Sequence, residues 1–391
     1  MKSFWLFTIS SALSKLGNTF LYVAVPWSFL QATGSPVYAA ASLACQTAPY
    51  FASPLLGKLI DERNNRRTLY ALSEIVQAGA VATLAALSIF DSLKAIISLL
   101  LLVVIGSGGV ISNITGDFTI APSLVEEDGA DKAYSRYNTA IELGRLLGPF
   151  CAGVVLAVGG PAITLLCDAA TFLLTAIVAM RIPQSTAMQP IRSKHTRTIR
   201  NALNVMRAIP GLVPLTAILC MHNLGVGGLT IALMSVGDEY WRLDPIVLGG
   251  VLTGGAFATV VGAGASGRVL IEVCYRRRIR FWLIVCLIGS FCIAMPTPWS
   301  IVLGYCLLSF GEGGIASVTM AFRYHSIPGD YSGRVNAIIW MFAMGAIPPS
   351  YMLFGYLCSV RSYQAAFLFP AILIASSSLV WHLHLKSPGS R

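Results

Sequence analysis

Charged side chains are scarce in this sequence of 391 residues, of which only 11% are Asp, Glu, Lys or Arg. Hydrophobic residues make up 55% of the chain, whereas a soluble globular protein carries about a quarter charged residues. The chain therefore has too few charged side chains to cover a water-facing surface. Its composition excludes a soluble enzyme, a soluble nucleic-acid-binding protein and a disordered scaffold.

Patterns that hold metals or disulfides are also missing, and the one match to a dinucleotide-binding pattern, at 262–267, lies late in an apolar helix and indicates close helix packing. The nine cysteines contain no C-x-x-C pair and lie mostly in apolar stretches, as buried inert thiols do. There is no Gly-rich loop followed by Lys and Ser or Thr, which argues against ATP-driven transport by this chain. We therefore expect no cofactor, no metal site and no enzymatic activity.

The chain is rich in long apolar stretches. A helix of about 20 apolar residues is long enough to cross a bilayer. Charge and Pro or Gly punctuation divide the stretches into twelve predicted spans. They run over 4–30, 36–57, 68–90, 95–119, 134–158, 161–181, 211–237, 245–267, 281–295, 299–324, 335–358 and 362–384. The first is too long for the apolar part of a signal peptide, so we interpret it as a retained helix.

The chain has a net charge of +10, and its basic residues are distributed unevenly between the two sides of the predicted spans. With both termini in the cytoplasm, 22 of the 27 Lys and Arg residues lie on the inner side and three on the outer side. This asymmetry is the one that the positive-inside rule predicts for a protein of the cell inner membrane. The basic residues then face anionic membrane lipid, and we expect no nucleic-acid partner.

An internal repeat relates the two halves of the chain. The segment 57–60 with its following Arg pair recurs at 267–270, the glycine-rich segment 106–112 recurs at 311–317, and Leu16-Gly17 recurs as Leu224-Gly225. The three offsets are similar and the order is the same. Duplicated halves are common in transporters and predict a substrate site between them.

Four short motifs resemble the major facilitator superfamily. They are the loop 57–67 and the segments 145–149, 168–172 and 333–335, the last three being similar to macrolide-efflux-like and enterobactin-exporter-like carriers. The resemblance implies an all-α membrane protein with twelve transmembrane helices in two pseudo-symmetric six-helix bundles. We assign residues 1–181 and 211–391 to the bundles and 182–210 to a basic cytoplasmic linker.

The loop 57–67 predicts a conformational latch. Gly57 ends a helix, and the Asp61 carboxylate can accept hydrogen bonds at a helix N-terminus or pair with Arg66 or Arg67. Making and breaking these contacts would favour one orientation of the cavity over the other. The alternative interpretation is a solvated charged turn.

Glu312 is the leading candidate for proton coupling or substrate binding. It lies near the middle of the tenth span between glycines that permit close helix packing, and ionisable groups inside spans are costly. The alternative is a carboxyl with a purely structural role. Glu142 and Arg145, three residues apart in the fifth span, are a second coupling candidate, although a structural ion pair is favoured there.

Polar side chains on the first and seventh spans are candidates for the substrate cavity. Lys15, Asn18 and Tyr22 share one helix face, and the resemblance implies that spans one, four, seven and ten line the cavity. His222 and Asn223 occupy the corresponding stretch of the seventh span. Lys15 as a fixed counter-ion is the alternative.

Three further acids lie in spans without a functional assignment. Glu74 and Asp117 are expected near the inner ends of their spans, where water is within reach, and the resemblance implies a packing or capping role for Asp168.

These features favour a secondary transporter that exports an amphipathic organic compound, such as a drug, a siderophore or another secondary metabolite, in exchange for protons. The alternative is an importer or facilitator of a siderophore, peptide or similar metabolite on the same fold. We expect the protein to act as a monomer.

Overall fold

The computed structural model describes residues 2–53, 55–56, 60, 65–89, 95–116, 120–121, 124, 130–182, 199–268, 274–295 and 297–386. The regular secondary structure of these residues is helical, without a strand, as the composition predicts. The chain forms two compact units. Unit 1 comprises Met1–Lys194 and Tyr240–Thr253, and unit 2 comprises His195–Glu239 and Gly254–Arg391.

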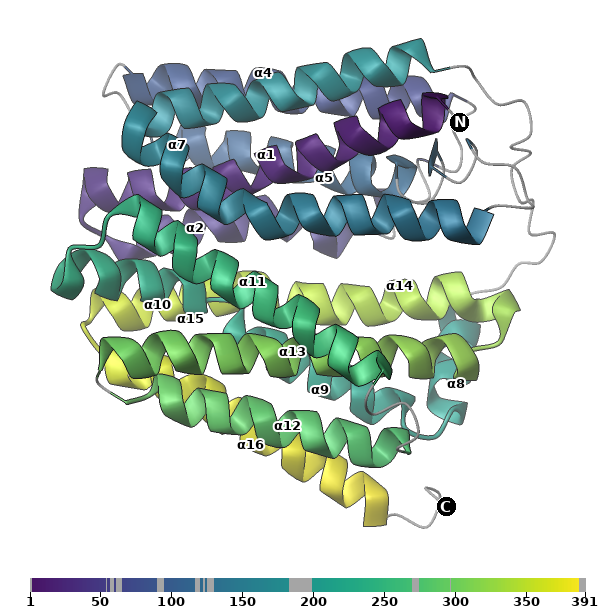
Figure 1. Ribbon diagram of the computed structural model, residues 1–391. Coiled ribbons are helices and arrows are strands. Elements are labelled where there is room, and N and C mark those ends of the chain that lie inside the picture. The colour runs from purple at the N-terminus through teal and green to yellow at the C-terminus, as the bar shows by residue number, and fades with distance from the viewer. Residues whose placement is uncertain are drawn as a thin grey trace. The chain divides into compact units, whose positions relative to one another are not determined.

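Unit 1 is built from long helices that follow the predicted spans (Figure 1). Its elements are α1 (Lys2–Thr33), α2 (Pro36–Thr47), the 3-10 helix η1 (Ala48–Ala52), α4 (Arg66–Ile89), α5 (Ala95–Thr115) and α7 (Ala130–Arg181). One end of the bundle is closed by aromatic packing. The ring of Phe7 lies 5.6 Å from that of Tyr70 and is stacked 6.1 Å from that of Tyr137, and all three residues are buried.

Helix α7 contains two predicted spans, joined at a break. Gly160 has φ 70° and ψ −179°, which is not helical, and Pro161 follows it. Both arms of α7 return to the same part of α1: Thr175 Oγ1 donates to the Ser10 carbonyl at 3.0 Å, and Gly144 packs against the backbone of Ala12. The chain therefore reverses at Gly160, where glycine allows the positive φ.

Unit 2 contains the remaining helices (Figure 1). They are α8 (Ile199–Ala208), α9 (Leu212–Val226), α10 (Leu229–Val236), α12 (Tyr275–Ile293), α13 (Pro298–Ser326), α14 (Gly329–Gly345), α15 (Ile347–Ser359) and α16 (Tyr363–Lys386). The π-helical η4 (Gly237–Trp241) and α11 (Pro245–Arg268) each contain a boundary between the units. Ala202 and Met206 of α8 are buried in a cluster with Leu212 and Ile339, so this part of the predicted linker is an ordered helix of unit 2.

Among the described residues, eight helices are long and apolar enough to cross a membrane by length and composition. One of these, Arg136–Arg181, spans 46 residues and covers the predicted fifth and sixth spans. The helix of the predicted ninth span, α12, begins at Tyr275, ahead of the span's approximate start at residue 281, and its first turns carry several arginines. Long cationic side chains can extend from a helix end toward the membrane surface, so charge alone did not mark the helix start.

Candidate functional site

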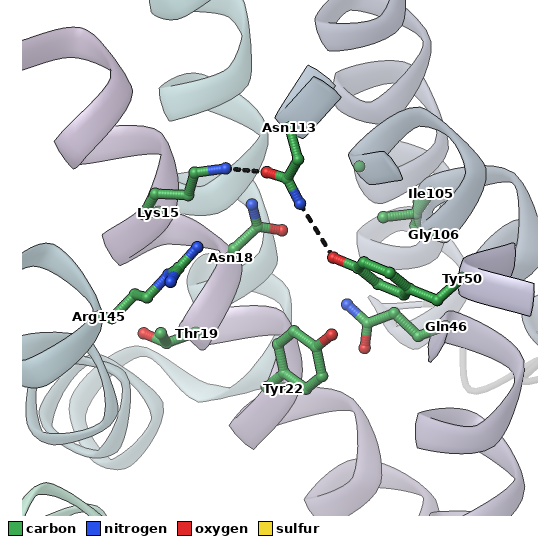
Figure 2. A pocket seen from close by; sticks show the side chains of 11 residues that line it. Lys15, Asn18, Thr19, Tyr22, Gln46, Tyr50, Ile105, Gly106, Asn113 and Arg145 are labelled. Atoms are coloured by element: carbon green, nitrogen blue, oxygen red, sulfur yellow. Dashed lines mark hydrogen bonds between the residues drawn. The ribbon is translucent and has the colours of Figure 1, made fainter. Parts of the chain in front are cut away.

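A cavity of about 370 Å³ opens among the helices of unit 1 (Figure 2). Four of its lining residues lie at positions 15, 18, 19 and 22 of α1, a spacing that puts them on one helix face. The lining residues are Lys15, Asn18, Thr19, Tyr22, Gln46, Tyr50, Ile105, Gly106, Gly109, Asn113 and Arg145. The predicted stripe of Lys15, Asn18 and Tyr22 therefore does face a cavity, together with the predicted coupling candidate Arg145.

A hydrogen-bonded chain crosses this cavity from α1 to η1. Lys15 Nζ donates to Asn113 Oδ1, and Asn113 Nδ2 donates to the Tyr50 hydroxyl at 2.9 Å (Figure 2). The amide of Asn113 thus accepts at one end and donates at the other, which fixes its orientation between a cation and a phenol. Sequence reasoning missed Asn113 and Tyr50 as cavity residues. The signal available for Asn113 was a polar amide near the C-terminal end of a predominantly apolar span.

The cavity wall combines cations with neutral polar and aromatic groups. Arg145 Nη1 bonds to Glu142 Oε1 at 2.8 Å as an i,i+3 pair on α7, and both side chains are about half exposed. This geometry matches the structural ion pair that the sequence favours. Lys15 and Arg145 give the cavity positive charge, while Gln46 and Tyr22 offer uncharged polar atoms. Such a wall can hydrogen-bond to polar groups of an organic ligand while its rings contact the apolar part.

A second polar centre lies within unit 2, where two candidates from different helices meet. His222 Nε2 of α9 lies 2.9 Å from Glu312 Oε1 of α13. The His222 side chain is 6% exposed and that of Glu312 is 31% exposed. The neighbouring Asn223 donates from Nδ2 to the Ala343 carbonyl of α14 at 2.8 Å. The pair thus joins a buried imidazole to a carboxyl that remains partly open.

Close helix packing surrounds Glu312, as its flanking glycines predict. A Cβ on Gly313 would collide with the backbone of Thr259 on α11, and one on Gly311 would collide with Cys286 on α12. The missing side chains let three helices approach closely at this level. The carboxyl of Glu312 is therefore held on a helix that has little freedom to shift.

Two acids of unit 1 are buried, and for one of them this differs from the expectation, while Asp117 lies outside the described residues. Glu74 is only 1% exposed, so the expectation that water reaches it is wrong, because neighbouring helices cover its position on α4. Asp168 of α7 is fully buried. The Ser112 and Ser14 hydroxyls donate to the Glu74 carboxylate, the latter at 3.4 Å.

The structure describes only some residues of the predicted latch. Gly57 and Asp61 lie outside the described residues. Arg67 donates from Nη1 to the carbonyl of Ile182, just after α7 ends, so it connects the start of α4 to the end of another helix of the same unit. A cation at a helix C-terminus is stabilised by the helix dipole. Arg66 begins α4 beside it.

No cluster of three or more His, Cys, Asp or Glu side chains that could hold a metal ion occurs within the described part of the chain. All nine cysteines are unpaired with one another.

Comparison with known proteins supplies the family. The family model of the Major Facilitator Superfamily matches residues 7–348. The multidrug efflux pump Tap of Mycolicibacterium fortuitum is 25% identical over 361 residues, which cover 90% of this chain and 88% of that protein. The multidrug efflux pump Tap of Mycobacterium tuberculosis is 23% identical over 388 residues, 96% of this chain and 92% of that protein.

Two solved structures have the same fold over almost their whole length. A bacterial homologue of the iron transporter ferroportin has a TM-score of 0.77 and 17% identity, covering 99% of each chain. The nucleoside transporter NupG has a TM-score of 0.76 and 10% identity, covering 99% of this chain and 100% of that one. The predicted all-α fold of two six-helix bundles is thereby confirmed.

Proposed function

The chain belongs to the major facilitator superfamily, a family of membrane transporters and not of enzymes, and from that premise we propose that it is a proton-coupled exporter of an amphipathic organic compound. The cargo is a drug, a siderophore or another secondary metabolite. It crosses the cytoplasmic membrane by alternating access, with both chain termini on the cytoplasmic side. The named function of the Tap relatives, multidrug efflux, supports this choice over import.

The observation that carries the coupling proposal is the contact between His222 and Glu312. Two ionisable groups from different helices meet at 2.9 Å in an apolar bundle, and the carboxyl is still 31% exposed. Ionisable groups in this setting mark ion or substrate pathways, because burying them without a function is costly. A carboxyl that is held by a partner and still partly exposed is suited to take up and release a proton.

The proposed cycle uses local electrostatics. When Glu312 is ionised, His222 donates to it from Nε2 and the pair ties α9 to α13. Protonation of Glu312 removes its charge and weakens this link, which favours the other orientation of the cavity. Substrate binding favours the ionised form, so that one proton leaves as one substrate enters.

Recognition of the cargo is assigned to the unit 1 cavity. Lys15 and Asn18 offer polar contacts and Tyr22 offers a ring face for the apolar part of the substrate. Arg66 and Arg67, with Gly57 and Asp61, remain our candidates for the conformational latch.

The test uses inside-out vesicles from a host that lacks its own efflux pumps. Energised vesicles receive cationic, neutral or anionic amphiphiles while a fluorescent dye reports lumenal pH. Wild type is compared with Glu312→Gln and with the control Glu239→Gln, which changes a carboxylate of the exposed Glu239–Arg361 pair. We expect substrate-triggered proton release in wild type and in the control, and none in Glu312→Gln.

Two results would contradict the proposal. If Glu312→Gln accumulates the compound against its gradient with unchanged pH dependence, Glu312 does not couple transport to protons. Uptake that only equilibrates the compound, with or without a proton gradient, would identify a facilitator instead of an antiporter.

A further inference from the structure

Unit 1 contains a pair of buried acids that the proposed cycle does not use. Glu74 lies on α4 and is 1% exposed, and Asp168 lies on the second arm of α7 and is 0% exposed. An ionised carboxylate costs several kcal/mol to bury unless it is paired and hydrogen-bonded. The hydrogen bonds available to each acid therefore decide which of them can carry a charge.

The two carboxyl groups differ in their hydrogen bonds. Glu74 receives one from Ser112 on α5 and one from Ser14 on α1. Both oxygens of Asp168 are buried and have no hydrogen-bond partner among the described residues. The hydroxyl of Thr171, which lies close by, donates to the backbone carbonyl of Asp168 at 2.8 Å instead. Glu74 is thus equipped to be an anion, and Asp168 is not.

The net charge of the groups around Glu74 and Asp168 is balanced by one bound proton. The two acids meet the same stretch of α1 as Lys15, since Glu74 bonds to Ser14 and Asp168 lies against Gly17. The ionisable groups that the packed helices bring to this cluster are Lys15, Glu74 and Asp168, while α5 contributes the hydroxyl of Ser112. Nearby on the first arm of α7, Glu142 and Arg145 neutralise each other. Two carboxylates facing one ammonium group carry one negative charge in excess, which a single proton removes.

Packing around Asp168 leaves little space for a larger ion. A Cβ on Gly17 of α1 would come within 2.7 Å of Asp168 Oδ1 and would collide with Thr171. The carboxyl therefore lies directly against the backbone of α1, two residues from Lys15. Because Lys15 also lines the cavity, one side chain is shared by the acid cluster and the cavity wall.

We propose that Glu74 and Asp168 form a proton-binding site within unit 1, separate from the His222–Glu312 pair, with Lys15 linking it to the cavity. The proton comes from the aqueous phase and forms an O–H bond on the Asp168 carboxyl, while Glu74 stays ionised beside Lys15. A substrate that engages Lys15 withdraws positive charge from Glu74 and so changes how strongly the pair holds its proton. This coupling to substrate rests on the proposed function, whereas proton binding does not.

Infrared difference spectroscopy tests the site without any transport. Purified protein in lipid is brought from acid to alkaline pH, and the carbonyl stretch of protonated carboxylic acids is recorded. We expect wild type to lose such a band on alkalinisation, Asp168→Asn to lack it, and Glu74→Gln to shift it. The matched variant Glu312→Gln should keep it, since it removes a carboxyl in the other unit.

Controls separate loss of the site from loss of the fold. Asp168→Asn and Glu74→Gln keep the size of the side chain, and both are checked by size-exclusion chromatography and thermal unfolding. If Asp168→Asn fails to fold, Lys15→Gln serves in its place, because removal of the ammonium group should move the band to higher pH. An unmoved band in that variant would contradict the electrostatic link.

Other outcomes would overturn the proposal. Identical difference spectra for wild type and Asp168→Asn would mean that Asp168 does not exchange a proton. Loss of the band on replacing choline by sodium at constant pH would make the site one for a metal cation. If vesicles show no substrate-driven proton release while the Asp168 band persists, the proposed function fails and the proton site stands.

Discussion

The acidic side chains of the two units differ in how far they are exposed and in which groups they pair with. In unit 1, Glu74 and Asp168 are buried among the helices and do not line the cavity, whereas Lys15 beside them does. In unit 2, Glu312 is paired with one histidine and keeps 31% of its side chain exposed. The two units therefore differ in the side chains that surround their acids.

A coupled transporter needs groups that exchange protons rapidly and groups that hold their charge state, and the two units differ in this respect. A partly exposed carboxyl can exchange protons with water directly, whereas an enclosed carboxyl exchanges them only when the surrounding helices move. We infer that Glu312 of unit 2 is the rapidly exchanging carboxyl of the proposed cycle, and that the acid pair of unit 1 is a second, slower proton site that responds to substrate through Lys15. The following variants test that comparison.

The largest expected effect is on packing around the acid cluster of unit 1. Gly17→Ala should lower the free energy of unfolding by about 1–3 kcal/mol, because its methyl group would strike Thr171 and the Asp168 carboxyl. The repeat-related Gly225→Ala places a methyl group 3.3 Å from Leu373 and should cost less than about 1 kcal/mol. Thermal unfolding of purified protein measures both. Equal losses would mean that the two units are packed alike at this position.

The next effect is the coupling between His222 and Glu312. In a double-mutant cycle with His222→Gln and Glu312→Gln, we expect a coupling energy of about 1 kcal/mol from the part-buried contact. The exposed pair Glu239–Arg361, 3.3 Å apart, serves as the reference and should give close to zero. Additive losses at His222 and Glu312 would contradict a functional link between α9 and α13.

A smaller effect is expected on substrate charge. Lys15→Gln should weaken binding of anionic amphiphiles about three- to tenfold, the equivalent of one hydrogen bond to a charged group or less, and should leave cationic ones unaffected. Arg200→Gln, which removes an exposed charge from α8, is the control. Ligand-induced tryptophan fluorescence gives both affinities. Equal weakening of anionic and cationic ligands would place Lys15 outside the binding surface.

The smallest effect concerns the pair on α7. Glu142→Gln should change the free energy of unfolding by only about 0.3–0.5 kcal/mol, because both side chains are about half exposed. Thermal unfolding at low and high salt measures it. A loss above 2 kcal/mol would show that the pair is needed to hold α7, and would revive Glu142 and Arg145 as coupling residues.

Much of the candidate site could be predicted one helix at a time. The stripe at Lys15, Asn18 and Tyr22 follows from helical spacing, and it does line a cavity. Glu312 was identified because an acid is costly in an apolar span. The partners of these residues were not predictable in the same way. Asn113 of α5 bonds to Lys15 from 98 residues along the chain, and Tyr50 of η1 bonds to Asn113 in turn.

The sequence by itself determined the helical spans, the duplication and the family, because apolar length, charge distribution and short motifs are local properties of the chain. Only the tertiary structure decided that His222 meets Glu312 across 90 residues and that Glu74 lacks access to water. Burial and pairing depend on which faces of different helices pack together. Helical periodicity fixes the faces of each helix, and the packing of whole side chains fixes their neighbours.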